Sequence, residues 1–396
     1  MPIRLSDAEF TRRREAVSHA MAGRDLELLC LFSPTQVFYM TGFPFIATER
    51  PIGIVYDPGR DAVTLFVPLL EREHAQEAHV DSVLTYDEYP GECHPMTQLA
   101  AWIDERSSAG VRIGVDADGY GGGFGYVGPR LSELIEGEIA VAKDLIERRM
   151  RIKSEEEIGL IRESCHWGGV AHRLLQEYTQ VGLGESDISI HASRDASMRM
   201  IETLGSEYRA MRSGAFCAHA GFRGQVGAQS AVPHALSINA VLVPGDVLVT
   251  GAAAEVGGYL SELERTMILG RPTREQARLF GLMVGAQDLA FQTIGPGVRC
   301  CDVDRAMTEY YREHELCDAW RHHTGHGIGY GMHEAPFLDV GDDTVIEPGM
   351  VLTVEPGIYV PGLAGFRHSD TILVTASGIE RLTEYPRGLD DLTIPA

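Results

Sequence analysis

The sequence predicts an α+β protein with two domains, a smaller N-terminal α/β domain and a larger C-terminal domain built on an antiparallel sheet. With 396 residues the chain is long enough to bury two cores. Strand-like and helix-like segments alternate over residues 1–143, whereas longer helical segments separate groups of short strands over residues 161–396. Residues 144–160 carry charges of both signs and predict a helix that connects the two domains.

Within the N-terminal domain, Ser6 and Glu9 form a capping box for a helix that Gly23 is expected to end. Four apolar runs are expected to form strands, at residues 26–32, 36–40, 51–56 and 62–67. A polar helix, a strand, a second helix and a last strand are expected at residues 69–78, 82–86, 96–106 and 112–118. The glycine-rich run 121–125 lacks a strand–turn–helix context, so we expect a loop rather than a phosphate-binding site.

The C-terminal domain is expected to combine helices with a β-hairpin. Helical patterns cover residues 171–180, 274–294 and 302–316. The apolar run 247–249 and the segment SELERT, residues 261–266, predict the two strands of the hairpin. Side chains two residues apart share a face of a strand, so Glu262 and Glu264 are expected to point the same way.

Composition excludes several classes of partner. Lys and Arg number 34 against 57 Asp and Glu, and the resulting charge of −23 argues against a nucleic-acid or anionic-lipid partner. The N-terminus is charged and has no apolar signal-peptide core, and no run is long enough to span a bilayer. Seven cysteines without CxxC spacing suggest neither a disulfide framework nor a zinc knuckle. We therefore expect a cytoplasmic protein.

His and acidic residues of the second domain are concentrated in separate short motifs. These contain His234 (VPHAL), His326 and His333 (TGHGIGYGMHEAP), Glu355 (MVLTVEPGIYV) and residues 367–370 (GFRHSDTILVT). Glu355 follows a strand apolar enough to be fully buried, where an unpaired carboxylate would be costly. The glycines around His326 permit close backbone approach. We therefore expect these motifs to form one site.

The order of these motifs resembles the creatinase, prolidase and aminopeptidase P superfamily, whose catalytic domain is called the pita-bread fold. The resemblance covers essentially the whole chain. In the metallopeptidases of that superfamily five side chains hold two divalent metals, and the corresponding positions here are Gly251, Glu262, His326, Glu355 and Ser369. Two of the five cannot supply a carboxylate, so a pair of metal ions is not expected.

The metal-free branch of the superfamily, typified by creatinase, resembles this chain in the LERT motif and in a His before the hairpin. That resemblance implies that Glu264 and Glu355 grip a cationic substrate and that His234 is the acid/base. A planar guanidinium or amidinium matches carboxylates in this way, and a His can protonate the leaving nitrogen. His326 and His333 complete the expected catalytic residues.

The expected substrate-binding residues are Glu262, Arg367, His368 and Asp370, together with Arg50, which the resemblance places in the active site of a partner subunit. The same resemblance implies a homodimer in which the partner's N-terminal domain lies near the active site. The sequence thus predicts a hydrolase that cleaves a C–N bond of a small cationic or zwitterionic metabolite without a metal or other cofactor.

Three alternatives stay open. The first is a metal-dependent Xaa-Pro dipeptidase with a reduced site, in which a single divalent metal binds Glu262, His326 and Glu355. The second is an inactive homologue that serves as a binding module. The third is a lyase on the same scaffold, which product analysis would separate from a hydrolase.

Overall fold

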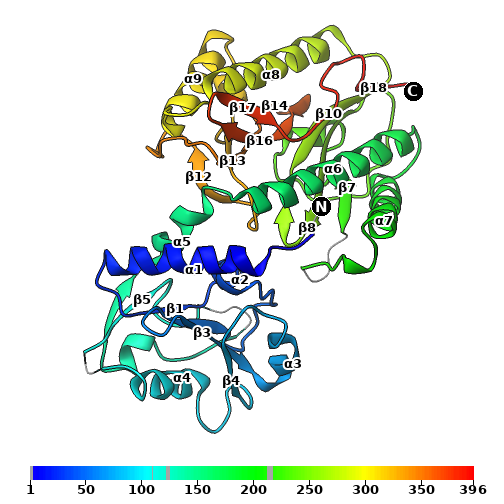
Figure 1. Ribbon diagram of the computed structural model, residues 1–396. Coiled ribbons are helices and arrows are strands. Elements are labelled where there is room, and N and C mark those ends of the chain that lie inside the picture. Colours follow the sequence, from blue (N-terminus) through cyan, green and yellow to red (C-terminus); the bar gives the residue numbers. More distant parts are fainter. Residues whose placement is uncertain (1–2, 109, 122–124, 212–216) are drawn as a thin grey trace. The chain divides into compact units, whose positions relative to one another are not determined.

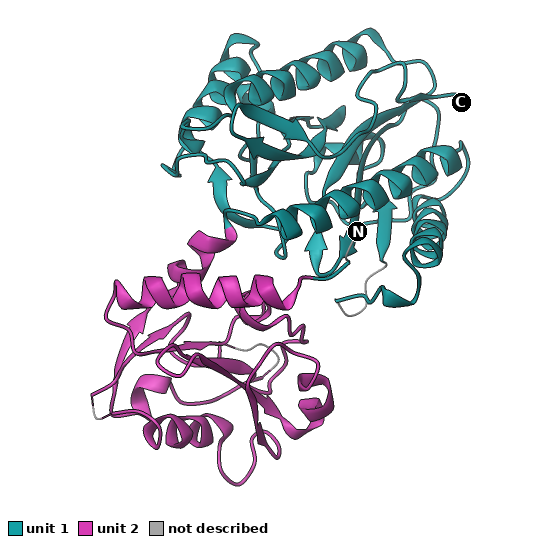
Figure 2. Cartoon of the chain, in the orientation of Figure 1, with its two compact units in different colours: residues 1–4, 151–396 teal, residues 5–150 magenta. Residues whose placement is uncertain are grey.

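The computed structural model describes residues 3–108, 110–121, 125–211 and 217–396, and the chain divides into two compact units (Figure 1, Figure 2). One unit comprises Leu5–Met150, and the other comprises Arg151–Ala396 together with Ile3 and Arg4. Of the glycine-rich run 121–125, residues 122–124 lie outside the described residues. Among the described residues, no helix combines the length and the apolar character needed to cross a lipid bilayer.

The smaller unit is an α/β layer structure around a six-stranded sheet in the order β4-β3-β2-β1-β5-β6. Its strands are β1 (Leu28–Leu31), β2 (Gly53–Asp57), β3 (Ala62–Pro68), β4 (Ser82–Tyr86), β5 (Arg112–Val115) and β6 (Glu138–Val141). Its helices are α1 (Asp7–Ala22), α2 (Pro34–Thr41), α3 (Arg72–Ala75), α4 (Pro95–Asp104) and α5 (Lys143–Met150). Alternate residues of β1 belong to two separate hydrophobic clusters, so both faces of the sheet are buried.

Two expectations for this unit are wrong. Residues 36–40, expected as a strand, lie in α2, because Pro34 starts a helix and Gly42, with a φ of 68°, ends it. The expected helix over residues 69–78 is reduced to a 3-10 turn and the single turn of α3. The remaining elements confirm an α/β domain, including α1, whose cap Ser6 accepts a hydrogen bond from the Glu9 N–H.

The larger unit is built on a ten-stranded sheet with the main order β12-β11-β13-β16-β10-β8-β7. These strands are β7 (Ala218–Gly221), β8 (Val247–Val256), β10 (Leu263–Leu269), β11 (Gly325–Gly327), β12 (Glu334–Leu338), β13 (Val351–Val354) and β16 (Ser369–Thr375). The short strands β9 (Tyr259–Leu260), β17 (Gly378–Arg381) and β18 (Thr393–Ile394) extend the sheet, and β14 (Gly357–Val360) pairs with β15 (Ala364–Arg367). Antiparallel pairs dominate, as an α+β domain requires.

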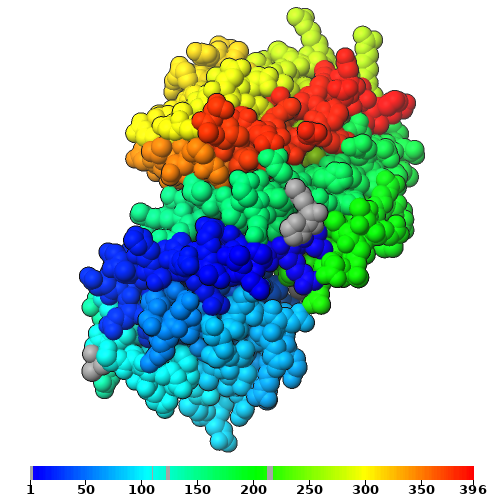
Figure 3. Space-filling model, viewed as in Figure 1, coloured from blue at the N-terminus to red at the C-terminus, as the bar shows by residue number. Residues whose placement is uncertain are grey.

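Four long helices cover this sheet: α6 (Glu155–Tyr178), α7 (Glu185–Leu204), α8 (Arg274–Thr293) and α9 (Cys300–Glu313). Helix α6 packs on β8 and α7 on β7, while α8 lies against β13 and β15 (Figure 1). In the space-filling view the C-terminal residues, in red, lie on the surface of this unit close to α8, and Arg387 donates a hydrogen bond to Asp288 of α8 (Figure 3). The predicted α+β class and pita-bread architecture are confirmed.

The segment 144–160 is not the single connecting helix that was expected. Helix α5 ends at Met150, and α6 begins at Glu155, because Ser154 and Glu157 form a capping box that starts a new helix. Between the helices, Ile152 forms a bridge with Met350, and the Lys153 N–H donates to the Gly349 carbonyl. The break therefore lets the chain pair with residues 349 and 350, which lead into the interior strand β13 of the larger unit.

Candidate metal centre

Three predicted side chains converge at the centre of the larger sheet. Glu262 precedes β10, His326 lies in β11 and Glu355 directly follows β13. Each offers one ligand atom, and these three atoms lie within 4.8 Å of one another. His326 Nε2 is 3.2 Å from Glu355 Oε1 and 4.0 Å from Glu262 Oε2.

His326 is oriented by the backbone around it. Its N–H donates to Thr353 Oγ1 at 3.0 Å, and its Nδ1 lies 3.0 Å from the Gly327 carbonyl oxygen. Because a carbonyl can only accept, Nδ1 carries a proton, which leaves Nε2 to face the two carboxylates. Nε2 is buried and makes no hydrogen bond of good geometry within the described residues. A buried nitrogen that faces two carboxylates without such a bond fits the donor set of a divalent metal.

Electrostatics at the cluster favour a cation. Burial and the nearby carboxylates of Glu355 and Glu264 raise the pKa of Glu262 well above its usual value. Burial opposes ionisation of Glu355, but contact with His326 and the charge of Arg367 outweigh it and lower the pKa of Glu355. Burial also disfavours the charged form of His326, yet the carboxylates of Glu355 and Glu262 raise its pKa. Glu355 is therefore already stabilised by His326 and Arg367, whereas Glu262 is a crowded carboxyl group whose ionised form a bound cation would favour.

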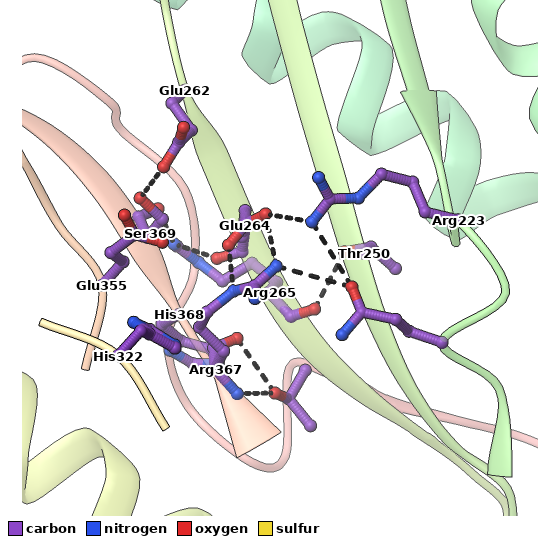
Figure 4. Close-up of polar contacts among 12 residues, drawn as sticks. Arg223, Thr250, Glu262, Glu264, Arg265, His322, Glu355, Arg367, His368 and Ser369 are labelled. Carbon is purple, nitrogen blue, oxygen red and sulfur yellow. Dashed lines mark hydrogen bonds and ion pairs between the residues drawn. The ribbon is translucent and has the colours of Figure 1, made fainter. Parts of the chain in front are cut away.

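Glu264 already has positive partners. Arg367, which is buried, contacts both carboxylate oxygens, with its Nη2 2.6 Å from Oε1 (Figure 4). Arg223 Nη2 lies 2.9 Å from the same Oε1. Two guanidinium groups therefore share the Glu264 carboxylate. This pairing argues against the expected role of Glu264 as a clamp for a cationic substrate, because its charge is fully compensated within the chain.

Gly251 and Ser369 face Glu264 from the two neighbouring strands. Gly251 of β8 and Ser369 of β16 are both register partners of Glu264 in β10. A Cβ atom at Gly251 would lie 3.5 Å from Glu264 Oε1 and 3.8 Å from Arg223 Nε. Ser369 donates its hydroxyl to Glu262 Oε1 at 2.7 Å. The residues present therefore fit one divalent ion at the three-residue cluster and do not fit a second.

Further imidazoles surround the cluster. The His333 ring stacks on the His326 ring, with centroids 3.8 Å apart and planes at 18°. The pKa of His333 is lowered mainly by burial and by the charge of His326. His234, which is exposed, makes a smaller contribution in the same direction. His322 Nε2 lies 2.8 Å from the Tyr359 hydroxyl, which also contacts Arg367. His333 is therefore brought to the cluster, and His234 lies close enough to act on it.

Sequence reasoning missed three residues here, Arg223, His322 and Tyr359. Tyr359 lies in the EPGIY motif and His322 directly precedes TGHG, so their nearness to the recognised motifs could have indicated them. Arg223 lies outside every motif considered, and no comparable signal points to it.

The structure does not bring two expected substrate-binding residues to the cluster. Arg367 and Ser369 face it, so the alternation of an extended chain turns His368 and Asp370 to the other side of the sheet. There Asp370 accepts hydrogen bonds from Arg265 at 2.8 Å and from Thr383 at 2.7 Å. The buried His368 ring packs edge-on against Phe280. For His368 and Asp370 the predicted substrate-binding role is wrong.

Arg50 belongs to the other unit, where it contacts Glu49 and lies 2.8 Å from Glu88 Oε1. Its predicted contribution to the site of a second copy stays a prediction.

Comparisons with protein families, with single sequences and with solved structures all find similarity to peptidases. Residues 159–376 match the family model described as metallopeptidase family M24, and residues 13–151 match the creatinase/prolidase N-terminal domain. The chain is 27% identical to the Xaa-Pro dipeptidase of Pyrococcus furiosus over 95% of its own length and 99% of that protein. It is 31% identical to the probable dipeptidase PepE of Mycobacterium tuberculosis over 63% of each chain. The prolidase structure from Pyrococcus horikoshii OT3 superposes with a TM-score of 0.77 at 25% identity, covering 96% of this chain and 99% of that one.

These matches overturn two expectations. The predicted metal-independent hydrolysis of a cationic metabolite is contradicted, and so is the predicted absence of a cofactor, because the matching family is one of metallopeptidases and the similar proteins are dipeptidases. The physical reason lies at Glu264 and His326. The negative charge of Glu264, which was expected to hold a cationic substrate, is neutralised by Arg367 and Arg223. His326 Nε2, at a position that binds metal in the family, faces two carboxylates.

Proposed function

Because this chain belongs to metallopeptidase family M24, we propose that it is a metal-dependent dipeptidase that cleaves the peptide bond before proline in Xaa-Pro dipeptides. Its similarity to an Xaa-Pro dipeptidase over nearly the full length of both chains supports this substrate class. The observation that carries the proposal is the buried His326 Nε2, which faces Glu262 and Glu355 without a well-directed hydrogen bond.

One divalent ion would be held by Glu262, His326 and Glu355, a set of one imidazole and two carboxylates. When bound, such an ion lowers the pKa of a coordinated water and polarises a substrate carbonyl. The Gly327 carbonyl fixes the His326 tautomer, and the Ser369 hydroxyl holds one oxygen of Glu262. These contacts pre-orient the ligand atoms and reduce the reorganisation that binding requires.

The proton transfers of hydrolysis need a group beside the ligands. His333 stacks on His326 and is exposed to solvent, so its ring can pass a proton between the site and bulk water. His234, which is exposed and acts electrostatically on His333, is the second candidate. We propose that one of them protonates the leaving proline nitrogen. A homodimer in which a second copy supplies Arg50 also stays a proposal.

Metal analysis of the purified protein, combined with a chelation assay, tests this function. The expected result is about one divalent ion per chain, loss of dipeptide hydrolysis after chelation, and recovery with Mn(II) or Co(II). Glu355→Gln should lose both the ion and activity, whereas Glu275→Gln, at an exposed acid on α8, should keep both. Hydrolysis that persists in chelator, or an Xaa-Pro dipeptide that is not cleaved by the metal-loaded protein, would reject the proposal.

A further inference from the structure

Two guanidinium groups share one carboxylate beside the candidate metal centre, so the group formed by Arg223, Glu264 and Arg367 has one excess positive charge. Arg367 is buried, and its three nitrogens already contact Glu264 and Tyr359. The side chain of Arg223, in contrast, is 52% exposed. The excess charge is therefore presented to solvent by Arg223.

Arg223 also has hydrogen-bond donors to offer. Its Nη2 is held by Glu264 at 2.9 Å and lies 3.4 Å from Gln225 Oε1. Within the described part of the chain, its Nε and Nη1 make no hydrogen bond. A planar guanidinium that is anchored at one nitrogen can bind a carboxylate with its remaining donors, and the anchor reduces the entropy lost on binding.

The backbone at Arg223 is strained, with a φ of 52°, in the left-handed region that costs a non-glycine residue about 1–2 kcal/mol. Glu185, a buried acid at the start of α7, holds this turn in place. One of its oxygens accepts the Gly224 N–H at 2.9 Å, and the other accepts the Ser237 hydroxyl and the Ile238 N–H. A strained residue held by a buried acid next to a candidate site points to a functional constraint on that residue.

We infer that Arg223 binds the carboxylate of the substrate next to the metal centre. This inference rests on the proposed function, and it names the end of the substrate that the site recognises, since a dipeptide with uncharged side chains has one carboxylate, at its C-terminus. Arg367 is a positioning residue, because it fixes Glu264, which in turn anchors Arg223. Arg223 Nε lies 3.8 Å from the position that a Cβ atom at Gly251 would take, so the guanidinium lies beside a position where this chain has no side chain.

Titration calorimetry of chelator-treated protein, which does not turn over substrate, tests this role. The two probes are alanyl-proline and alanyl-prolinamide, which differ in the terminal charge. Wild-type protein should bind the carboxylate form at least about tenfold more tightly, as expected for a charge-assisted hydrogen bond. Arg223→Gln should reduce this preference to less than about twofold while leaving amide binding unchanged.

Arg194→Gln is the matched control, because Arg194 is also largely exposed and pairs with a single acid, Asp195. It should keep the wild-type preference. If Arg223→Gln does not fold, Arg223→Lys carries the test, since it keeps the charge but lacks the planar fork, and its preference should fall at least threefold.

Equal binding of the two probes by wild-type protein, binding of neither, or an equal loss for both probes in the variant would overturn the inference. An unchanged preference in Arg223→Lys, used where Arg223→Gln does not fold, would also overturn it. If the proposed function alone fails, the protein will contain no bound metal and show no dipeptidase activity, but it will still bind the carboxylate probe more tightly than the amide probe.

Discussion

Lys153 Nζ lies 2.8 Å from Glu334 Oε2, and both side chains are almost completely buried. Glu334 Oε1 also accepts the Gly331 N–H at 2.7 Å. This pair joins the segment between α5 and α6 to the turn that carries His333. The ion pair connects two residues that lie 181 positions apart in the sequence. It therefore holds in place the turn with His333, a proposed proton-transfer residue.

Removing one partner of this pair should be costly. Lys153→Met leaves the Glu334 carboxylate buried without its cation, and we expect a loss of about 3–5 kcal/mol in the free energy of unfolding. Denaturant unfolding measures this change. The surface variant Arg278→Met, which breaks the exposed pair with Glu275, is the control and should lose less than about 1 kcal/mol. Similar small losses in both variants would contradict the prediction.

Glu185 should matter for both stability and substrate affinity. Glu185→Ala leaves the N–H groups of Gly224, Ile238 and Ala240 without their acceptor, and each such group costs about 1–3 kcal/mol if it stays buried. Because this loop carries Arg223, KM for a dipeptide should rise more than kcat falls. Steady-state kinetics on metal-loaded protein distinguishes the two effects, and an unchanged KM would argue against control of Arg223 by this acid.

Tyr359 should stabilise the arrangement of Arg367. Its hydroxyl lies 3.0 Å from Arg367 Nη1 and 2.8 Å from His322 Nε2, so Tyr359→Phe removes a hydrogen bond from a buried cation. We expect a loss of about 1.5–3 kcal/mol in unfolding free energy with the metal content unchanged. Tyr310→Phe, which removes one bond to the Leu282 carbonyl, should cost about 1 kcal/mol. Loss of metal from Tyr359→Phe would show that Tyr359 acts on the ligands instead.

His172 should make the protein sensitive to acid. Burial and the charge of Arg265 lower its pKa to about 3, whereas an unfolded His titrates near 6.5. Between these values the unfolded chain binds a proton that the folded chain does not, so His172 lowers stability progressively as the pH falls below about 6.5. Its contribution has a slope of up to about 1.4 kcal/mol per pH unit.

Unfolding free energies at pH 7 and pH 5 measure this contribution. His172→Gln should lose less stability between these two values than wild type, whereas His166→Gln, at an exposed site on α6, should behave like wild type. An identical pH dependence in His172→Gln and wild type would show that other groups carry the effect.

The fold could be predicted from local signals because most of its elements have clear ones. Ser6 caps α1, and the apolar runs at 51–56 and 62–67 form β2 and β3. The run at residues 36–40 misled the prediction because a buried helix and a buried strand are both apolar on all sides. There Pro34 and Gly42 were the better evidence.

The site could be predicted in part. Glu262, His326 and Glu355 lie in separate motifs, and the expectation of one shared site agrees with their positions in the structure. The partners of Glu264 could not be predicted, because Arg223 and Arg367 lie 41 and 103 residues away in sequence, and a lone carboxylate does not indicate whether a substrate or an arginine neutralises it. The placement of His368 and Asp370 could have been inferred from the alternation of a strand.

The row formed by Gly251, Glu264 and Ser369 across three adjacent strands has a consequence for attempts to redesign this centre. An acid introduced at either flanking position would be placed beside the existing central one, and like charges in direct register repel. A single substitution to an acid at Gly251 or Ser369 should therefore destabilise the protein. Binding of a second ion should require a change at all three positions together, so that Arg223 and Arg367 no longer pair with residue 264.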